Sequence, residues 1–254
     1  MQGDTKDECL SNVSDTVSLL KKLGFLTHPD KSVLVPVQVI TFLGFILDSI
    51  QMLVRPKLEK AQKLKTTCQK LLTKTEVTVQ ELAEAIGIIV SNFPGVEFGP
   101  LFYRGLKRDK SCALKQSKEN FSSKLQLSSD AIAKLNWWCE NIESATNHVT
   151  HGNPDIIITT NASTLGWGAV LETQSIVGQW TEAEACHHIN YLELLATFLA
   201  LKSFCKNVSK VHVLLRSDNT TTVAYLNSMG GMQSLQCDRL TKEIWLWCMQ
   251  RDMG

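Results

Sequence analysis

The sequence predicts a mixed α/β (α+β) protein in which a mostly helical N-terminal part precedes a mixed sheet with flanking helices. Helical spacing of apolar residues dominates the first part, and the pattern changes to strands after "TNHVTHGNPD". The order that follows is strand-strand-strand-helix-strand-helix-helix. The 254 residues, 44% of them hydrophobic, suffice for one large or two ordinary domains. We therefore expect two domains, residues 1–150 and 151–254.

Helical signals in the first part come from apolar spacing and capping residues. Apolar residues three and four positions apart predict a helix over residues 12–24, and a second apolar face predicts one over residues 56–72. Short β-like runs between these two helices predict a small hairpin-like unit. Thr78 and Glu81 form a capping-box pattern that begins a third helix. Another capped helix is expected over residues 128–144.

In the second part, "IIITTNA", "GWGAVLE" and "SIVGQW" predict three consecutive strands. A long helix, "HINYLELLATFLALKSFC", leads to a fourth strand, "KVHVLLRS". If the first and fourth strands are neighbours, Asn161 and Asp218 end side by side, and a helix across one face brings Glu193 over them. Carboxylate oxygens are preferred ligands of Mg²⁺, so this cluster would suit a divalent metal.

Each of these residues also has a simpler interpretation. Glu193 could lie on the solvent side of an amphipathic helix, and Asp218 could be a helix N-cap. Only their joint placement favours a site. Two-metal phosphodiester hydrolysis needs charged ligands around two ions about 3.5–4 Å apart, and the amide of Asn161 offers a single neutral oxygen.

Charge and cysteine usage narrow the class of protein only slightly. The formal net charge of +1 neither requires nor excludes a nucleic-acid partner. The eight cysteines show no spacing typical of zinc sites, so reduced thiols are expected. No long apolar run or apolar signal core is present, which favours an intracellular protein, in the cytoplasm or nucleus, without a membrane partner. No oligomeric state follows from the sequence.

A lysine-rich segment, "KLEKAQKLKTTCQKLLTK", is the candidate nucleic-acid contact. Lys57, Lys60, Lys63 and Lys65 lie on a predicted helix and could contact a phosphate backbone. A solvated helix face is the alternative.

Three blocks in order resemble one family: "TTNASTLGWGAV", "GQWTEAEACHHINYLELLATFLAL" and "LLRSDNTTTVAYLNSMGG". They are similar to the ribonuclease H domain of reverse transcriptases from DIRS-like, tyrosine-recombinase-encoding retrotransposons. "QGDTKDEC" and "SNFPGVEFGPL" resemble the palm end, thumb and connection of the same polyproteins. The resemblance implies two-metal hydrolysis, with Mg²⁺ or Mn²⁺, of the RNA strand of RNA–DNA hybrids. Glu193 and Asp218 match catalytic and metal-binding positions, and Asn161 stands where the family has aspartate.

The resemblance also implies that the chain is a fragment. The polymerase motif Tyr-x-Asp-Asp would precede its first residue, and a fourth acidic ligand and a fifth strand would follow Gly254. We therefore expect no polymerase activity, a C-terminally truncated ribonuclease H-like domain, and little or no nuclease activity. A non-catalytic nucleic-acid-binding or scaffold module and a non-functional relic of the element remain the alternatives.

Overall fold

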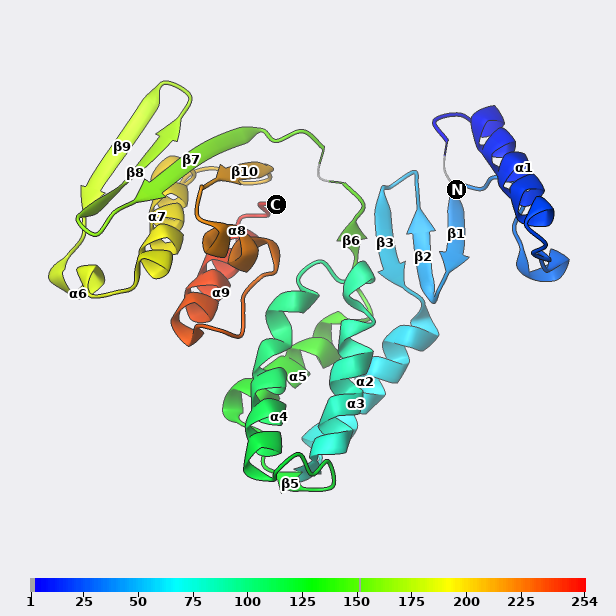
Figure 1. The fold of residues 1–254 in the computed structure, drawn as a ribbon, viewed down its shortest axis with the longest axis horizontal. Helices are drawn as coiled ribbons and strands as arrows, with labels where there is room; N and C mark the ends of the chain where they lie inside the picture. The colour runs from blue at the N-terminus through cyan, green and yellow to red at the C-terminus, as the bar shows by residue number, and fades with distance from the viewer. Residues whose placement is uncertain (1–2, 151) are drawn as a thin grey trace.

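A helical bundle lies beside two four-stranded sheets in the computed structural model, which describes residues 3–150 and 152–254 (Figure 1). The predicted mixed α/β class is confirmed. The first part contains α1 (Lys6–Lys22), β1 (Val39–Phe42), β2 (Phe45–Asp48), β3 (Leu53–Pro56), α2 (Leu58–Leu72), β4 (Val77–Thr78), α3 (Val79–Val90), α4 (Arg104–Gln116), β5 (Lys124–Leu125), α5 (Ser129–Asn141) and β6 (Asn147–His148). The second part contains β7 (Ile156–Ala162), β8 (Gly166–Leu171), β9 (Gln174–Gln179), α6 (Glu182–Ala185), α7 (Ile189–Phe204), β10 (Val213–Arg216), α8 (Thr220–Asn227) and α9 (Leu235–Met249).

The first helix begins earlier than its apolar spacing indicates. The apolar spacing predicts a start at residue 12, but α1 begins at Lys6, because the Thr5 side chain accepts a hydrogen bond from the backbone N–H of Glu8 at 3.2 Å. The Glu8 carboxylate accepts in turn from the N–H of Asp4. Local capping therefore adds turns that bury no side chain, and the helix ends before Gly24, whose φ of 83° suits glycine.

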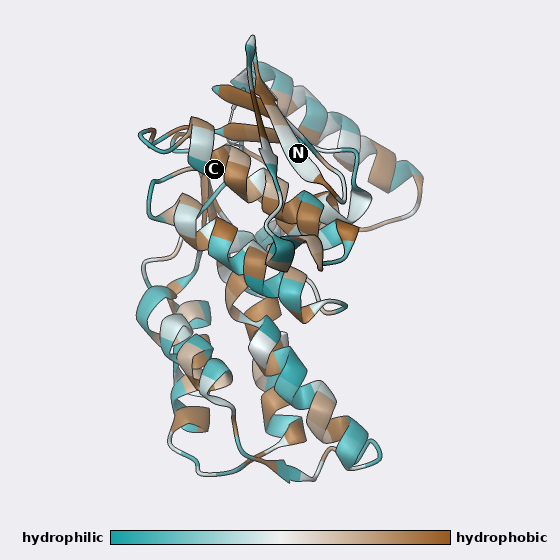
Figure 2. Cartoon of the chain, turned by 90° about the vertical axis from the view of Figure 1, so that its left-hand side faces the viewer, coloured by the Kyte–Doolittle hydropathy of each residue, from teal (hydrophilic) through white to brown (hydrophobic). Residues whose placement is uncertain are grey.

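Helices α2, α3 and α5 share the core of the first part. Leu64, Leu82 and Trp138 are fully buried there, and the Trp138 indole N–H donates to the backbone oxygen of Phe102 at 2.8 Å. The capping box predicted at the start of α3 is confirmed, with both reciprocal hydrogen bonds present. Helix α4 was not predicted. In Figure 2 the helices carry hydrophilic and hydrophobic residues on different faces, as expected when one face packs inward.

The sheet of the second part has the strand order β10-β7-β8-β9. β7, β8 and β9 form an antiparallel meander, whereas β10 pairs parallel with β7. A parallel partner needs a crossover connection, and α7 lies in that crossover. The Thr160 and Thr197 hydroxyls, 3.2 Å apart, join β7 to α7. The first and fourth strands are thus neighbours, which is the condition on which the juxtaposition of Asn161 and Asp218 depended.

Helix α9 contacts both parts of the chain. Trp245, Leu246 and Met249 pack against the core of the first part, and Leu240 and Ile244 belong to the core of the second. Helix α9 thus gives the two parts a shared apolar contact. The domain boundary near residue 150 stays a prediction. In residues 3–150 and 152–254, no helix has the length and apolar character needed to cross a membrane.

Candidate functional site

The register of two parallel strands brings Asn161 and Asp218 to the same edge of the sheet. Arg216 of β10 pairs with Thr159 of β7. Two residues further along each strand, the chain reaches Asp218 after β10 and Asn161 in β7, so these two positions lie opposite one another. Asp218 is exposed and lies in the short segment that joins β10 to α8.

Helix α7 places Glu193 over this edge. Its side chain is not solvent-facing, because the residue is only 5% exposed. The Thr197 hydroxyl, one turn further along, donates to the Glu193 backbone oxygen at 3.1 Å and contacts Thr160, which fixes this turn against β7. Burial raises the pKa of the Glu193 carboxyl, and nearby Asp218 raises it further, against the opposing hydrogen bond from the Ala162 backbone N–H.

One carboxylate oxygen of Glu193 is buried without compensation. Glu193 Oε2 has no hydrogen-bond partner among the residues that the structure describes. A buried carboxylate oxygen without a partner is costly, and a cation would compensate it. The donor set, Glu193 Oε2 with Asp218 beside it, therefore fits a divalent ion that takes oxygen ligands.

Asp218 is not the helix cap that the sequence allowed. The neighbouring Asn219 caps α8, because its Oδ1 accepts from the Thr222 N–H at 2.8 Å. Asn219 Nδ2 also donates to Asn190 Oδ1 at 3.0 Å, which ties α8 to the start of α7. The interpretation of Asp218 as the N-cap of α8 is therefore wrong, and its carboxylate does not serve as a helix cap.

Asn161 supplies no charge to this edge. Its side chain is exposed, and strand alternation places it on the opposite side of β7 from Thr160. It immediately precedes Ala162, whose N–H faces Glu193. Within the described parts of the chain, no group of three or more His, Cys, Asp or Glu side chains is arranged to hold a metal ion. The two carboxylates at this edge, Glu193 and Asp218, are too few to hold a pair of ions.

The lysines predicted to contact nucleic acid all lie on or beside α2, but three have neighbours within the protein. Lys57 and Lys65 each pair with a glutamate, at 3.1 and 2.6 Å, and Lys60 Nζ lies 4.1 Å from the centre of an aromatic ring. Burial lowers the pKa of Lys60. Lys63 is exposed. Lys60 and Lys65 therefore also join α2 to other elements of the first part.

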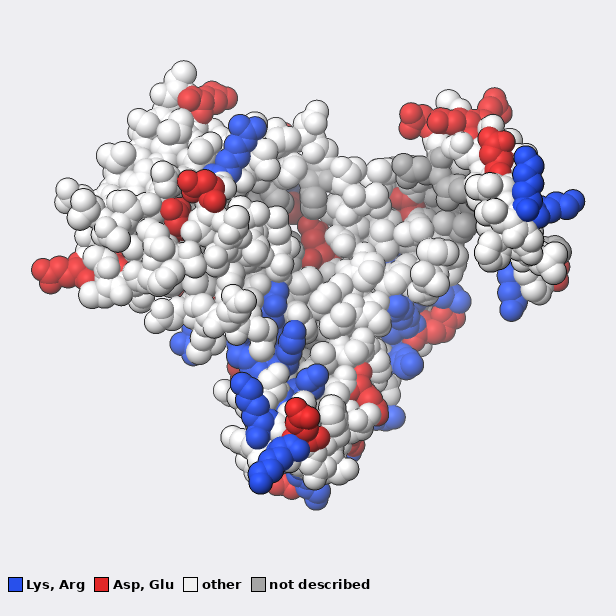
Figure 3. All heavy atoms as spheres, viewed as in Figure 1, with Lys and Arg blue, Asp and Glu red and all other residues white. Residues whose placement is uncertain are grey.

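A second basic segment was missed in the sequence. Helix α4 begins within "YRGLKRDK" and carries Arg104, Lys107, Arg108 and Lys110. Figure 3 shows Lys and Arg side chains gathered where Figure 1 places α4. The run of four cations in seven residues was the available signal.

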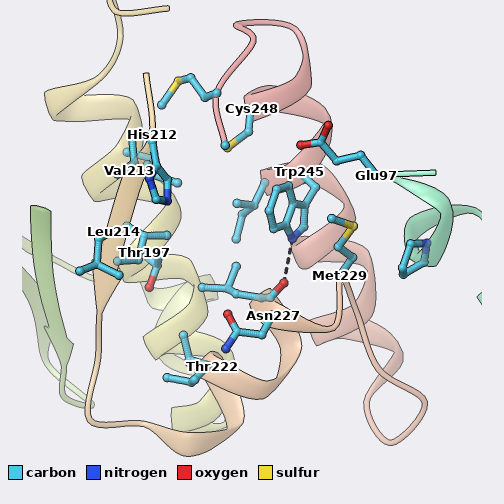
Figure 4. A pocket seen from close by; sticks show the side chains of 18 of the residues that line it. Glu97, Thr197, His212, Val213, Leu214, Thr222, Asn227, Met229, Trp245 and Cys248 are labelled. Atoms are coloured by element: carbon cyan, nitrogen blue, oxygen red, sulfur yellow. Dashed lines mark hydrogen bonds between the residues drawn. The ribbon is translucent and has the colours of Figure 1, made fainter. Parts of the chain in front are cut away.

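A cavity of about 670 Å³ lies between β10, helices α7, α8 and α9, and a segment of the first part that includes Phe93 and Glu97 (Figure 4). Its lining is mostly apolar, including Val213 and Trp245, whose indole N–H donates to a backbone oxygen at 3.0 Å. Thr197 and Ser217 connect it to the region of Glu193. The apolar lining offers few groups that could bind a phosphate.

No protein-family profile and no curated protein matches the sequence. Among solved structures, the chain is similar to a foamy viral protease-reverse transcriptase in complex with an RNA/DNA hybrid, with a TM-score of 0.47, 14% identity, and coverage of 100% of this chain and 33% of that one. A complex of the foamy viral protein with dsDNA gives a TM-score of 0.46 and 15% identity, covering 97% of this chain and 50% of that one. This chain spans half or less of those proteins. At this identity the likeness assigns no residue a role.

Proposed function

We propose that this chain is a nucleic-acid-binding module of reverse transcriptase/ribonuclease H type that binds RNA–DNA hybrids and lacks efficient hydrolysis. One observation carries the proposal: Glu193 and Asp218 meet at the edge of a sheet where the third position, Asn161, is uncharged. The three sequence blocks that contain these residues support an origin in a DIRS-like retrotransposon. An intracellular location belongs to the same proposal.

Glu193 and Asp218 would hold a single divalent cation, Mg²⁺ or Mn²⁺. Bound there, the ion would supply positive charge that attracts a phosphodiester oxygen. The chain itself positions the ligands: Thr160 and Thr197 fix the turn of α7, and the Ala162 N–H orients the Glu193 carboxylate. Because that carboxylate is buried, its charge is stabilised chiefly when a cation is present.

The amide at position 161 is the reason to expect weak hydrolysis. A two-ion site needs a ligand that shares negative charge between both ions, and Asn161, at the edge of the sheet where Glu193 and Asp218 meet, brings no negative charge. If this costs about 3–4 kcal/mol of transition-state stabilisation, the rate falls by two to three powers of ten, since about 1.4 kcal/mol is tenfold. Binding depends on lysine contacts and is not reduced in proportion.

The test measures binding and cleavage on the same hybrid. The full chain is titrated against an end-labelled RNA–DNA hybrid by fluorescence anisotropy, and cleavage is followed on gels in Mg²⁺ and in Mn²⁺. We expect salt-dependent binding without detectable turnover. Asn161→Asp should increase cleavage relative to the parent, and Asn161→Asp with Glu193→Gln should abolish the increase.

Two results would contradict the proposal. Rapid cleavage by the unaltered chain would refute the loss of hydrolysis, because Asn161 would then suffice as a ligand. An absence of binding at low salt would refute the nucleic-acid-binding function. Asn153→Asp, a matched change in the segment before β7, is the control for the added charge.

A further inference from the structure

The contact between α4 and α9 is built around a buried carboxylate. Asp238 of α9 is 7% exposed, and its Oδ2 lies 2.5 Å from Arg108 Nη1 of α4. Arg104 Nε lies 3.7 Å from Asp238 Oδ1 and 3.4 Å from the Met229 backbone oxygen, and Arg104 also donates to the Ser228 backbone oxygen. Arg104 and Asp238 therefore hold the two parts of the chain together.

A second carboxylate, Asp130 of α5, lies at the outer side of the same contact. Lys134 pairs with it one helical turn away, Arg108 Nη2 lies at 3.7 Å, and Lys242 Nζ of α9 lies at 3.9 Å. With Arg104, four cationic side chains thus surround two carboxylates. We call these six residues the basic joint. Its own acidic groups neutralise only half of its positive charge.

The uncompensated charge is accessible to solvent. Arg104 and Lys134 are nearly enclosed, with side chains 10% and 4% exposed, whereas those of Arg108 and Lys242 are 27% and 36% exposed. Burial lowers the pKa of Lys134, and Lys242 and Arg108 add to this effect against the attraction of Asp130. Like charges held this close are stabilised by an external anion.

Positive charge continues from the basic joint along α4. Lys107, Lys110 and Lys115 follow on this helix, where Asp109 is the single acidic residue. Asp109 Oδ2 already accepts a hydrogen bond from the Ser128 N–H at 2.8 Å. At a rise of 1.5 Å per residue, Lys107 and Lys115 are about 12 Å apart along the helix axis. Phosphates of one strand advance about 3.4 Å per nucleotide, so the span from Lys107 to Lys115 corresponds to several phosphates rather than one small anion, whereas Lys110 lies on a different side of the helix from Lys115.

We infer that the basic joint binds the phosphate backbone of a duplex, with Arg108 and Lys242 contacting one strand across the contact between α4 and α9. The inference rests on the proposed function and assigns the duplex a second contact, away from Glu193 and Asp218. A strand bound there touches both parts of the chain at once. It therefore stabilises the contact that Arg104 and Asp238 hold together.

The test uses Lys242→Gln in the full chain, with Lys206→Gln as the matched control. Lys206 is an exposed lysine just after α7 in the same part of the chain. Binding of a labelled RNA–DNA hybrid duplex is measured by fluorescence anisotropy at several salt concentrations. A chelator is present, so that no divalent ion contributes to binding. Loss of one phosphate contact reduces the salt slope by about 0.9, which makes the loss of affinity between 50 and 200 mM salt about 3.5-fold smaller.

The expected result is a shallower salt dependence for Lys242→Gln and an unchanged one for Lys206→Gln. Lys107→Gln changes a partly exposed lysine of α4 that belongs to none of the ion pairs described above, and it should act like Lys242→Gln. It tests the inference if the Lys242→Gln variant does not fold. Identical curves for all variants, with binding by the parent intact, would overturn this inference and leave the proposed function standing. An absence of binding by the parent chain would refute both this inference and the proposed function.

Competition distinguishes a strand from a single anion. Inorganic phosphate, at the phosphate concentration of an unlabelled duplex competitor, should displace little of the labelled duplex. If inorganic phosphate displaced as much labelled duplex as the unlabelled duplex does, the basic joint would be a site for one small anion. That result would overturn the inference of a backbone contact.

Discussion

Replacing Asp238 by alanine should destabilise the contact between the two parts of the chain. The substitution removes the partner of Arg104, whose side chain is 10% exposed, and of Arg108. It also removes the acceptor of the Gly231 N–H, which donates to Asp238 Oδ1 at 3.0 Å. Removing one partner of a buried ion pair costs about 3–5 kcal/mol, because the remaining charge stays buried.

For a chain of this size, about 1 kcal/mol shifts the unfolding midpoint by roughly 2–4 °C, so Asp238→Ala should lower it by about 6–20 °C. Thermal unfolding followed by far-UV circular dichroism measures the shift. Glu243→Ala is the control, because Glu243 is exposed on the same helix and the change in charge is equal. Its midpoint should move by no more than the effect of a typical surface substitution, about 0.5 kcal/mol. Equal shifts in the two variants would refute the role assigned to the buried ion pairs.

Three further predictions concern the acidic edge, the sheet and the thiols. Burial raises the pKa of Glu193, so ionisation of this carboxyl opposes folding. Without divalent ions, Glu193→Gln should therefore increase the free energy of unfolding at neutral pH. Urea unfolding should show that this increase disappears below the pKa of a glutamate in the unfolded chain. Gly166→Ala should cost about 1–3 kcal/mol in urea unfolding, because its Cβ would clash with the backbone oxygen of Gly178, whereas Gly168→Ala meets its nearest atom at 3.8 Å and should be tolerated; equal effects would contradict this account of the packing. Exposed Cys112 should react quickly with a thiol reagent, and Cys68, whose thiol pKa is raised by burial, only on unfolding; mass spectrometry of the labelled sites would expose the opposite order.

The sequence predicted the sheet of the second part because its signals are local. Alternating apolar residues and the turns between them indicated β7, β8 and β9, whereas the parallel pairing of β10 with β7 was a condition that only the structure supplies. From that pairing, the meeting of Asn161 and Asp218 followed. The placement of Glu193 needed tertiary information, because α7 has apolar residues on most sides and its pattern does not identify the buried face.

The sequence did not indicate features that depend on residues far apart in the chain, or on a choice between two adjacent residues with the same propensity. Asp218 and Asn219 are both good N-cap residues, and only the path of the chain after β10 selects Asn219. Arg104 and Asp238 are far apart in the sequence, so no local pattern indicates their ion pair. Helix α4 was missed because its cations outweigh a sparse apolar face.

The central claim is that the carboxylates of this edge hold one divalent ion and not two. Calorimetric titration of Mn²⁺ into the full chain, with Glu193→Gln in parallel, tests it directly. We expect one ion per parent chain, with its heat lost in the variant, because Glu193 Oε2 and Asp218 form a single incomplete cradle. Two ions per parent chain, both lost in the Glu193→Gln variant, would contradict the account.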